Sequence, residues 1–184
     1  MITSFFKLLK NEKPLTVAGA INPYSALLAK KTGIKALYIS GAGVANASFG
    51  LPDLALTSLD NVLEDLRRIR GISDLPILVD CDTGWGSALN ISKTTKEMIS
   101  AGASGIHIED QVSEKRCGHR PNKEIVSSDE MCDRMKAARD AISDDDFMLM
   151  ARTDAFAKEG LERTIDWFTN KNNLLNYKDN FYNI

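Results

Sequence analysis

The sequence has no long hydrophobic run, no strong excess of charge of either sign and no cysteine pair with metal-binding spacing. Its longest apolar runs, such as Ile77–Val79 and Ile106–Ile108, have the length of a strand and are too short to cross a bilayer. The first residues lack a basic region followed by an apolar stretch, so we expect no signal peptide. A net charge of -2 argues against nucleic acid or an anionic membrane as the main partner.

The cysteines indicate a reducing compartment. Cys81, Cys117 and Cys132 are odd in number and lack CxxC spacing, so we expect free thiols and a cytoplasmic protein. Cys117 and His119 have no second ligand pair, which excludes a structural zinc site. Cys81 directly follows a predicted strand and by alternation faces its helix side, and Cys132 lies within a predicted helix, so both are expected to be packing residues.

Short apolar runs alternate with longer amphipathic stretches along most of the 184 residues. This alternation predicts βα units, a parallel sheet and one domain with a substantial core. The predicted strands are Leu15–Gly19, Ala36–Ser40, Pro76–Asp80, Gly105–Asp110 and Phe147–Arg152. The predicted helices are Thr3–Asn11, Tyr24–Lys31, Leu59–Arg70, Ile91–Ala101 and Asp129–Ile142. Ser58 and Ser128 are expected to cap the helices that follow them.

Four successive predicted strands end with polar side chains on one face, because residues two apart in a strand share a face. The pairs on the polar face are Tyr38 and Ser40, Asp80 and Asp82, His107 and Glu109, and Met150 and Arg152. In a parallel barrel this face converges at the C-terminal mouth, where active sites lie. A Rossmann-like open sheet also binds ligands at strand ends. Asn46, however, stands where the third glycine of GxGxxG should be, so the sequence favours the barrel.

Three of these polar residues, Asp80, Asp82 and Glu109, are carboxylates without a thiolate or imidazole ligand in the set. Ligation by oxygen atoms suits a hard cation such as Mg²⁺. The alternative is that the acids cap helices or form ion pairs with Arg152 and Lys115. His107 points to the same face and is expected to be a hydrogen-bonded core residue rather than a base.

The polar connection Gln111–Val126 has the length of a lid or a binding loop. The basic residues around Cys117 are Lys115, Arg116, His119 and Arg120. Positive neighbours favour a thiolate, which creates a proton donor and acceptor or a nucleophile. Gly118 allows the backbone to approach a ligand closely. The alternative is an accidental cysteine in a basic surface loop.

The last sixteen residues, 169–184, break the pattern, because six of them are asparagine and no sixth strand follows. We expect a partial barrel domain over residues 1–168 and an atypical tail over 169–184. Five βα units do not close an eight-stranded barrel of about 250 residues, so we expect that the natural continuation was lost. A polar C-terminus is the alternative.

The segment Lys115-Arg116-Cys117-Gly118-His119 resembles the KRCGH motif of isocitrate lyases and 2-methylisocitrate lyases. Arg120-Pro121 directly after it is more similar to the 2-methylisocitrate lyases. The resemblance runs from about Phe5 to about Asp166. Further segments that resemble the family, in the family's order, are Tyr38–Gly43, Leu51–Leu54, Val79–Gly86, His107–Gln111 and Ala151–Ala155.

The resemblance implies a (β/α)8 TIM-barrel fold, incomplete here, with about five βα units and an N-terminal helix. It implies Mg²⁺, or alternatively Mn²⁺, and cleavage of 2-methylisocitrate, a small tricarboxylate, into pyruvate and succinate. Full-length members of the family are homo-oligomers. Asp80 and Asp82 would anchor the ion, with Glu109 contributing nearby.

The resemblance also implies roles for residues at the mouth of the barrel. Ser40, Gly41 and Ala42 would hold a substrate carboxylate. Arg152 would clamp a carboxylate or the developing oxyanion, Tyr38 would take or relay the hydroxyl proton, and Cys117 would protonate the succinate half. Further residues expected to contact the substrate are Asp53, Lys115, Gly118 and His119.

Two alternatives stay open at this point. Isocitrate lyase, phosphonomutase, phosphonopyruvate hydrolase and oxaloacetate decarboxylase belong to the same superfamily; the last three share the metal aspartates but generally lack KRCGH. A truncated, inactive remnant is the alternative from a different class, and it is favoured by the unusual tail.

Overall fold

A computed structural model describes residues 4–117 and 123–155 of the chain. The strands are β1 (Val17–Gly19), β2 (Ala36–Ile39), β3 (Ile77–Asp80), β4 (Gly105–Glu109) and β5 (Met148–Arg152). The helices are α1 (Phe5–Asn11), α2 (Pro23–Lys31), α3 (Gly41–Gly43), the π-helical turn η1 (Val44–Ser48), α4 (Leu59–Arg70), α5 (Ala88–Ser100) and α6 (Ser128–Asp140). Every predicted strand and helix is present, with bounds that differ by three residues or fewer.

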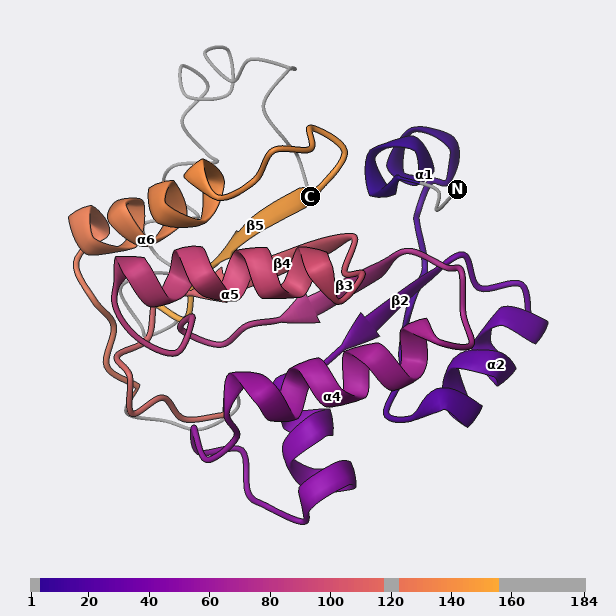
Figure 1. Cartoon of the computed structure of the whole chain (residues 1–184), viewed down its shortest axis with the longest axis horizontal. Coiled ribbons are helices and arrows are strands. Elements are labelled where there is room, and N and C mark those ends of the chain that lie inside the picture. Colours follow the sequence, from indigo (N-terminus) through magenta and orange to yellow (C-terminus); the bar gives the residue numbers. More distant parts are fainter. Residues whose placement is uncertain (1–3, 118–122, 156–184) are drawn as a thin grey trace, which may run out of the picture. The chain divides into compact units, whose positions relative to one another are not determined.

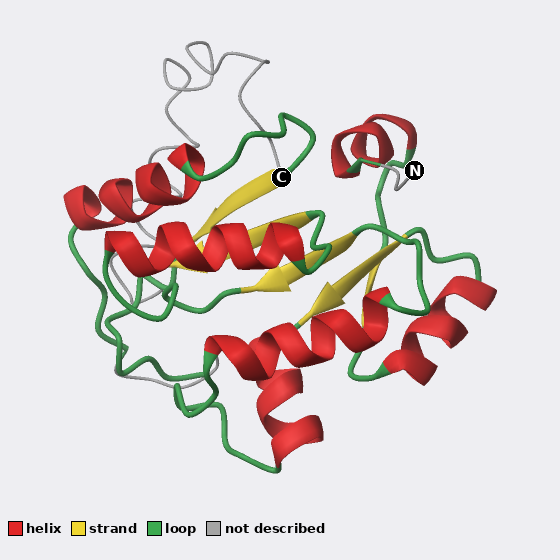
Figure 2. Ribbon diagram, in the orientation of Figure 1, coloured by secondary structure: helices red, strands yellow, loops and turns green. Residues whose placement is uncertain are grey.

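The five strands form one parallel sheet in chain order, β1-β2-β3-β4-β5. Figures 1 and 2 show the sheet with α2, α4, α5 and α6 along one of its faces. A doubly wound sheet would reverse its strand order and carry helices on both faces. Consecutive order with the crossover helices on one face is instead the arrangement of a (β/α)8 barrel, so the predicted fold class is confirmed.

The helix-side face of the sheet forms the main core. Val79 and Ile106 are fully buried there against α4 and α5, for example against Leu66 and Met98. Cys81 lies in the same layer, as the alternation along β3 predicted. Each fully buried Leu or Ile side chain contributes about 1.5–3 kcal/mol relative to an exposed one, so this layer fixes the positions of the strand ends.

The opposite face of the sheet is apolar where the strands begin and polar where they end. Phe5 and Leu8 of α1 pack against Ala36, Leu78 and Met148, near the start of β2, β3 and β5. Two positions further along each of these strands the same face carries other residues: Tyr38, Asp80 and Met150. The cluster around α1 extends as far as Tyr38 and Met150 and leaves Asp80 and the polar residues at the C-terminal ends of the strands outside it.

Three details differ from the sequence-based expectations. Cys132, which was expected to be a packing residue, is exposed on α6, so that prediction was wrong. Ser58 caps α4, as expected, but α6 is capped by Ser127, whose side chain accepts from Glu130 N, so the prediction of Ser128 was wrong by one residue. Two consecutive serines precede the acidic first turn, and the local sequence does not distinguish them. The short helix α3 and the turn η1 were not predicted, because their Gly- and Ala-rich sequence carries no hydrophobic period.

The chain divides by its internal contacts into one compact unit over residues 1–154 and a second over 155–184. The predicted boundary between residues 168 and 169 lies outside the described residues and stays a prediction. Among the described residues, no helix combines the length and the apolar character needed to cross a membrane.

Candidate active site

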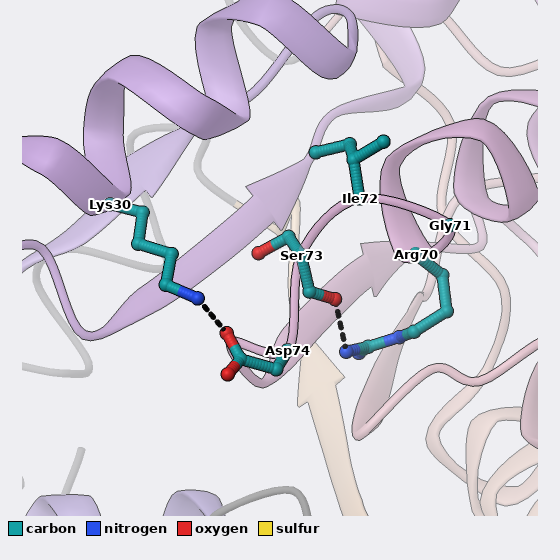
Figure 3. Close-up of a pocket in the computed structure, with 6 residues that line it drawn as sticks. All are labelled: Lys30, Arg70, Gly71, Ile72, Ser73 and Asp74. Carbon is teal, nitrogen blue, oxygen red and sulfur yellow. Dashed lines mark hydrogen bonds and ion pairs between the residues drawn. The ribbon is translucent and has the colours of Figure 1, made fainter.

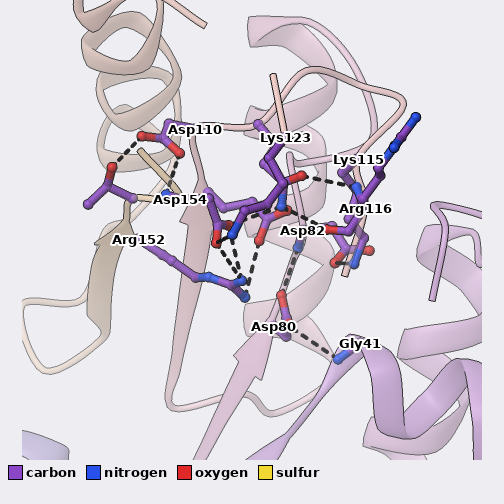
Figure 4. Close-up of polar contacts among 12 residues, drawn as sticks. Gly41, Asp80, Asp82, Asp110, Lys115, Arg116, Lys123, Arg152 and Asp154 are labelled. Carbon is purple, nitrogen blue, oxygen red and sulfur yellow. Dashed lines mark hydrogen bonds and ion pairs between the residues drawn. The ribbon is translucent and has the colours of Figure 1, made fainter. Parts of the chain in front are cut away.

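The polar ends of the strands converge on Asp80, the last residue of β3 (Figure 4). Its Oδ2 accepts a hydrogen bond from Gly41 N at 3.1 Å and lies 3.3 Å from the Tyr38 hydroxyl. Its Oδ1 accepts from Asp82 N at 3.0 Å. A Cβ added to Gly41 would lie 3.0 Å from Asp82 Oδ1 and 3.3 Å from Asp80 Oδ2. The two aspartates therefore point to the same place, as the alternation predicted, and Gly41 leaves room for both.

Asp82 follows β3 with a left-handed backbone (φ 47°) and is paired with a lysine. Lys115 Nζ lies 2.6 Å from Asp82 Oδ1 and 2.6 Å from Asp53 Oδ1, and its side chain is only 5% exposed. Burial, reinforced by Asp80 and opposed by Lys115, raises the pKa of Asp82 to about 6. Burial disfavours the ammonium of Lys115, but the carboxylates of Asp82 and Asp53 outweigh it and raise the pKa of Lys115.

Tyr38 and His107 form a stacked pair on the inner face of β2 and β4. Their ring centroids are 5.7 Å apart, and the Tyr38 hydroxyl lies 2.9 Å from His107 Nε2. Burial lowers the pKa of His107, so the imidazole is neutral, and the prediction of a hydrogen-bonded core residue is confirmed. Burial and the neighbouring Asp80 raise the pKa of Tyr38, which keeps its hydroxyl protonated.

Glu109, the last residue of β4, is fully buried and faces Arg152, the last residue of β5. Arg152 Nη1 lies 3.1 Å from Glu109 Oε2, and Gln111 Nε2 donates to Glu109 Oε1 at 2.9 Å. Burial raises the pKa of Glu109 to about 8, although Arg152 opposes the shift. The carboxyl group is therefore mostly protonated near neutral pH without a further cation.

Two buried residues of this network, Gln111 and Asp154, were not predicted from the sequence. Asp154 accepts from Gln111 Nε2 (3.0 Å), Lys123 Nζ (3.0 Å) and Arg152 Nη2 (3.1 Å). These partners outweigh burial and lower the pKa of Asp154. Gln111 and Asp154 lie two positions beyond Glu109 and Arg152, so the same period of two, continued past the strand ends, would have found them.

The expected carboxylate-binding segment follows β2 directly. Ser40 caps α3, and its Oγ accepts from Gly43 N at 3.4 Å. The Gly41 N–H is occupied by Asp80, and the Ala42 carbonyl accepts from Asn46 Nδ2 at 2.7 Å. Ser40 and Ala42 are half-buried at the edge of the acid cluster, so the structure brings this segment to the site.

The loop after β4 is fixed at its start. The Gln111 side chain accepts from Arg116 N and donates to Arg116 O, both at 3.0 Å, which ties the loop back to the end of β4. Cys117 follows directly and is half-buried. Gly118 and His119, the other two loop residues expected at the substrate, lie outside the described residues.

The acid cluster fits a hard cation in its chemistry. Asp82 Oδ1 and Glu109 Oε2 are buried oxygens that accept no hydrogen bond, although Lys115 and Arg152 lie at ion-pair distance from them. Buried carboxylate oxygens without a donor are suited to metal ligation. Within the described ranges, no three His, Cys, Asp or Glu side chains are already arranged around one point. A metal would therefore have to draw Asp82 and Glu109 away from their basic partners.

Two hollows lie at opposite ends of the sheet. A cavity of about 230 Å³ adjoins the acid cluster, and its lining includes Asp82, Lys115, Trp85 and Thr57. A larger, open hollow of about 480 Å³ is lined by Lys30 and residues 70–74 (Figure 3). These residues precede β2 and β3, so the larger hollow is at the N-terminal ends of the strands, away from the acids. The smaller cavity is the one that belongs to the candidate active site.

Comparisons with known proteins agree with this arrangement. A family described as phosphoenolpyruvate phosphomutase matches residues 5–168. The 2-methylisocitrate lyase of Shewanella oneidensis is 59% identical over 162 residues, which are 88% of this chain and 56% of that protein. The chain thus spans about half the length of such relatives. The solved structure of 2,3-dimethylmalate lyase is described as a member of the PEP mutase/isocitrate lyase superfamily. It matches this chain with a TM-score of 0.78 and 33% sequence identity, and the match covers 90% of this chain and 57% of that one. Phosphonopyruvate hydrolase, solved with oxalate and Mg²⁺, has a TM-score of 0.69 and 30% identity over 88% of this chain and 54% of its own.

Proposed function

Because the chain belongs to the phosphoenolpyruvate mutase/isocitrate lyase superfamily, we propose that it is a Mg²⁺-dependent lyase that cleaves 2-methylisocitrate into pyruvate and succinate. The observation that carries the proposal is the identity of 59% with a relative of that name, in a chain whose KRCGH segment begins at the acid cluster. Lys115, the first residue of that segment, contacts Asp82 directly.

Asp80, Asp82 and Glu109 are the residues that would hold the ion, because buried carboxylate oxygens suit Mg²⁺ and the related Mn²⁺. When bound, the ion acts as a Lewis acid that lowers the cost of ionising the substrate hydroxyl. In the metal-free chain, Lys115 and Arg152 lie at ion-pair distance from Asp82 and Glu109.

The substrate carboxylates are assigned to two groups, one at the end of β2 and one at the end of β5. The Ser40 hydroxyl and the backbone of Ala42 lie at the end of β2, beside the acids, and form one subsite. Arg152 at the end of β5 forms the other, since a planar guanidinium binds a carboxylate with two parallel hydrogen bonds. Its side chain is 33% exposed, which leaves part of the guanidinium accessible to a ligand.

Tyr38 and Cys117 move the protons. As the carbon–carbon bond breaks, its electron pair passes to the succinate half, and the hydroxyl of the pyruvate half loses its proton. Tyr38 accepts this proton only while it passes its own to Asp80, because its pKa is raised and a free phenolate is unfavourable. The Cys117 thiol supplies the proton of the new C–H bond on succinate, and the thiolate is reprotonated from solvent.

The test is pyruvate release from 2-methylisocitrate by the 184-residue chain, coupled to lactate dehydrogenase, with Mg²⁺ and with a chelator. Activity that requires Mg²⁺ and falls by about 10²–10⁴-fold in Cys117→Ser supports the proposal. Isocitrate, oxaloacetate and phosphonopyruvate, tested in parallel, distinguish the other activities of the superfamily. Faster turnover of one of these, or full activity of Cys117→Ser, would refute the assignment.

A further inference from the structure

Lys115 compensates two buried carboxylates that come from different parts of the chain. Its Nζ lies 2.6 Å from Asp53, which precedes α4, and 2.6 Å from Asp82, which follows β3. Both contacts are short, so one buried ammonium group compensates both acids at the same time.

The oxygen that Lys115 approaches is one that a metal ion would need. An ammonium group 2.6 Å from Asp82 Oδ1 occupies the space of a ligated cation, and the two positive charges repel each other strongly in a buried site. A divalent cation on Asp82 Oδ1 and the Lys115–Asp82 ion pair are therefore mutually exclusive. If Lys115 leaves Asp82, its hydrogen bond to Asp53 still compensates its charge.

We propose that Lys115 is an exchangeable counter-ion of the metal site, which neutralises Asp82 while the metal is absent and shifts onto Asp53 when a divalent cation binds. The inference rests on the metal site of the proposed function and deepens it. Lys115 and Asp53 then set the metal affinity without being metal ligands.

The surroundings of Lys115 provide room for this shift. The cavity of about 230 Å³ is bordered by both Lys115 and Asp82. Its lining also contains Ala55 (φ 58°) and Trp85 (φ 57°), which, with Asp82, are the non-glycine residues with positive φ in the described part of the chain. Backbone in this uncommon region persists where the surrounding structure holds it, and it gathers at functional sites.

The first test measures Mn²⁺ binding by the electron paramagnetic resonance signal of the free ion, in the wild type, Lys115→Met and Lys30→Met. Lys30 is the matched control, because it loses the same charge from an ion pair with Asp74 at the opposite end of the sheet. Removing Lys115 should tighten Mn²⁺ binding by about tenfold or more, as close charge pairs couple this strongly. Lys30→Met should change it by less than about twofold.

The second test separates exchange from general electrostatics. Asp53→Asn removes the acid that receives the displaced lysine, so Mn²⁺ should bind more weakly than to the wild type. In the double variant Asp53→Asn/Lys115→Met this weakening should disappear, because Asp53 acts through Lys115. An Asp53 effect that persists without Lys115 would overturn the exchange.

A third measurement needs no substitution. Acetic anhydride acetylates accessible lysines of the wild-type chain, and mass spectrometry of the peptide that carries Lys115 then reports the accessibility of this lysine. Without metal, the accessibility of Lys115 is low. Mn²⁺ should increase the labelling of Lys115 and leave that of Lys30 unchanged. The same labelling of Lys115 with and without Mn²⁺ would contradict the exchange. This measurement holds even if Lys115→Met fails to fold. If neither the wild type nor Lys115→Met binds Mn²⁺, the metal site itself is refuted. If both bind it equally, only the inference on Lys115 fails.

Discussion

Metal binding at the acid cluster should release protons, because two of the proposed ligands have raised pKa values in the metal-free chain. Asp82 has a pKa of about 6 and Glu109 a pKa of about 8. Each carboxyl group must be deprotonated before it can ligate a cation. At about pH 7, Glu109 is roughly 90% protonated and Asp82 roughly 10%, so binding of one ion releases about one proton. Above about pH 9 the release should approach zero.

The sign of the pH dependence follows from these values. A raised carboxyl pKa means that the metal-free state holds a proton that the metal-bound state lacks, so affinity rises with pH until the pKa is passed. Between about pH 6 and pH 8 the association constant should rise about tenfold per pH unit, below about pH 6 more steeply, and above about pH 8 it should level off.

Isothermal titration calorimetry with Mn²⁺, in buffers of different ionisation enthalpy, counts the protons directly. Glu109→Gln should reduce the release at about pH 7 to roughly 0.1 proton, because Asp82 alone then titrates. Release near zero from the wild-type chain at this pH, or an affinity that does not change between about pH 6 and pH 8, would refute the buried, protonated state of Glu109.

Three further substitutions test separate parts of the structure. Tyr38→Phe removes the hydroxyl between Asp80 and His107, so turnover should fall about 10²–10⁴-fold. The Mn²⁺ affinity, measured by paramagnetic resonance, should stay within about threefold of the wild type. Normal turnover would exclude the proton relay. Gly41→Ala places a Cβ 3.0 Å from an Asp82 oxygen and should weaken Mn²⁺ binding about tenfold, and unchanged binding would show that the acids move freely. Arg70→Met removes donors to three backbone carbonyls at the other end of the sheet. The free energy of unfolding in urea should fall by about 2–3 kcal/mol, and the Mn²⁺ affinity should not change. A fall below about 0.5 kcal/mol would contradict this structural role of Arg70.

Local periodicity predicted the strands and the inward-facing residues well. The period of two is a property of the extended backbone, so Tyr38 and Glu109 had to share the face of Asp80 once the strands were parallel and in register. The same rule placed Cys81 in the helix-side core. Because the helix-side face of the sheet is buried in the hydrophobic core, the polar residues of the strands point to the opposite face.

Contacts between loops could not be predicted in the same way. Lys115 and Asp53 are separated by 62 residues, and their ion pair depends on how two loops fold back over the strand ends. The sequence offered Lys115 both as a substrate contact and as an ion-pair partner for the acids, and no periodicity decides between them. The ion pair with Asp82 is the state of the metal-free chain, and a role toward substrate stays a prediction.

Burial is the main cause of the raised pKa values of Asp82 and Glu109, and the negative charge of Asp80 at the strand ends raises both further. Five carboxyl groups and three cations lie close together at the strand ends, beside the neutral His107. The acids are Asp53, Asp80, Asp82, Glu109 and Asp154, and the cations are Lys115, Lys123 and Arg152. Fully ionised, this network carries an excess of two negative charges in a buried region, where uncompensated charge is costly. At about pH 7 the proton on Glu109 relieves about one of these two charges in the metal-free chain, and one divalent cation would replace that proton and balance both charges. A monovalent cation would leave one negative charge uncompensated, so the charge balance favours a divalent ion at this site.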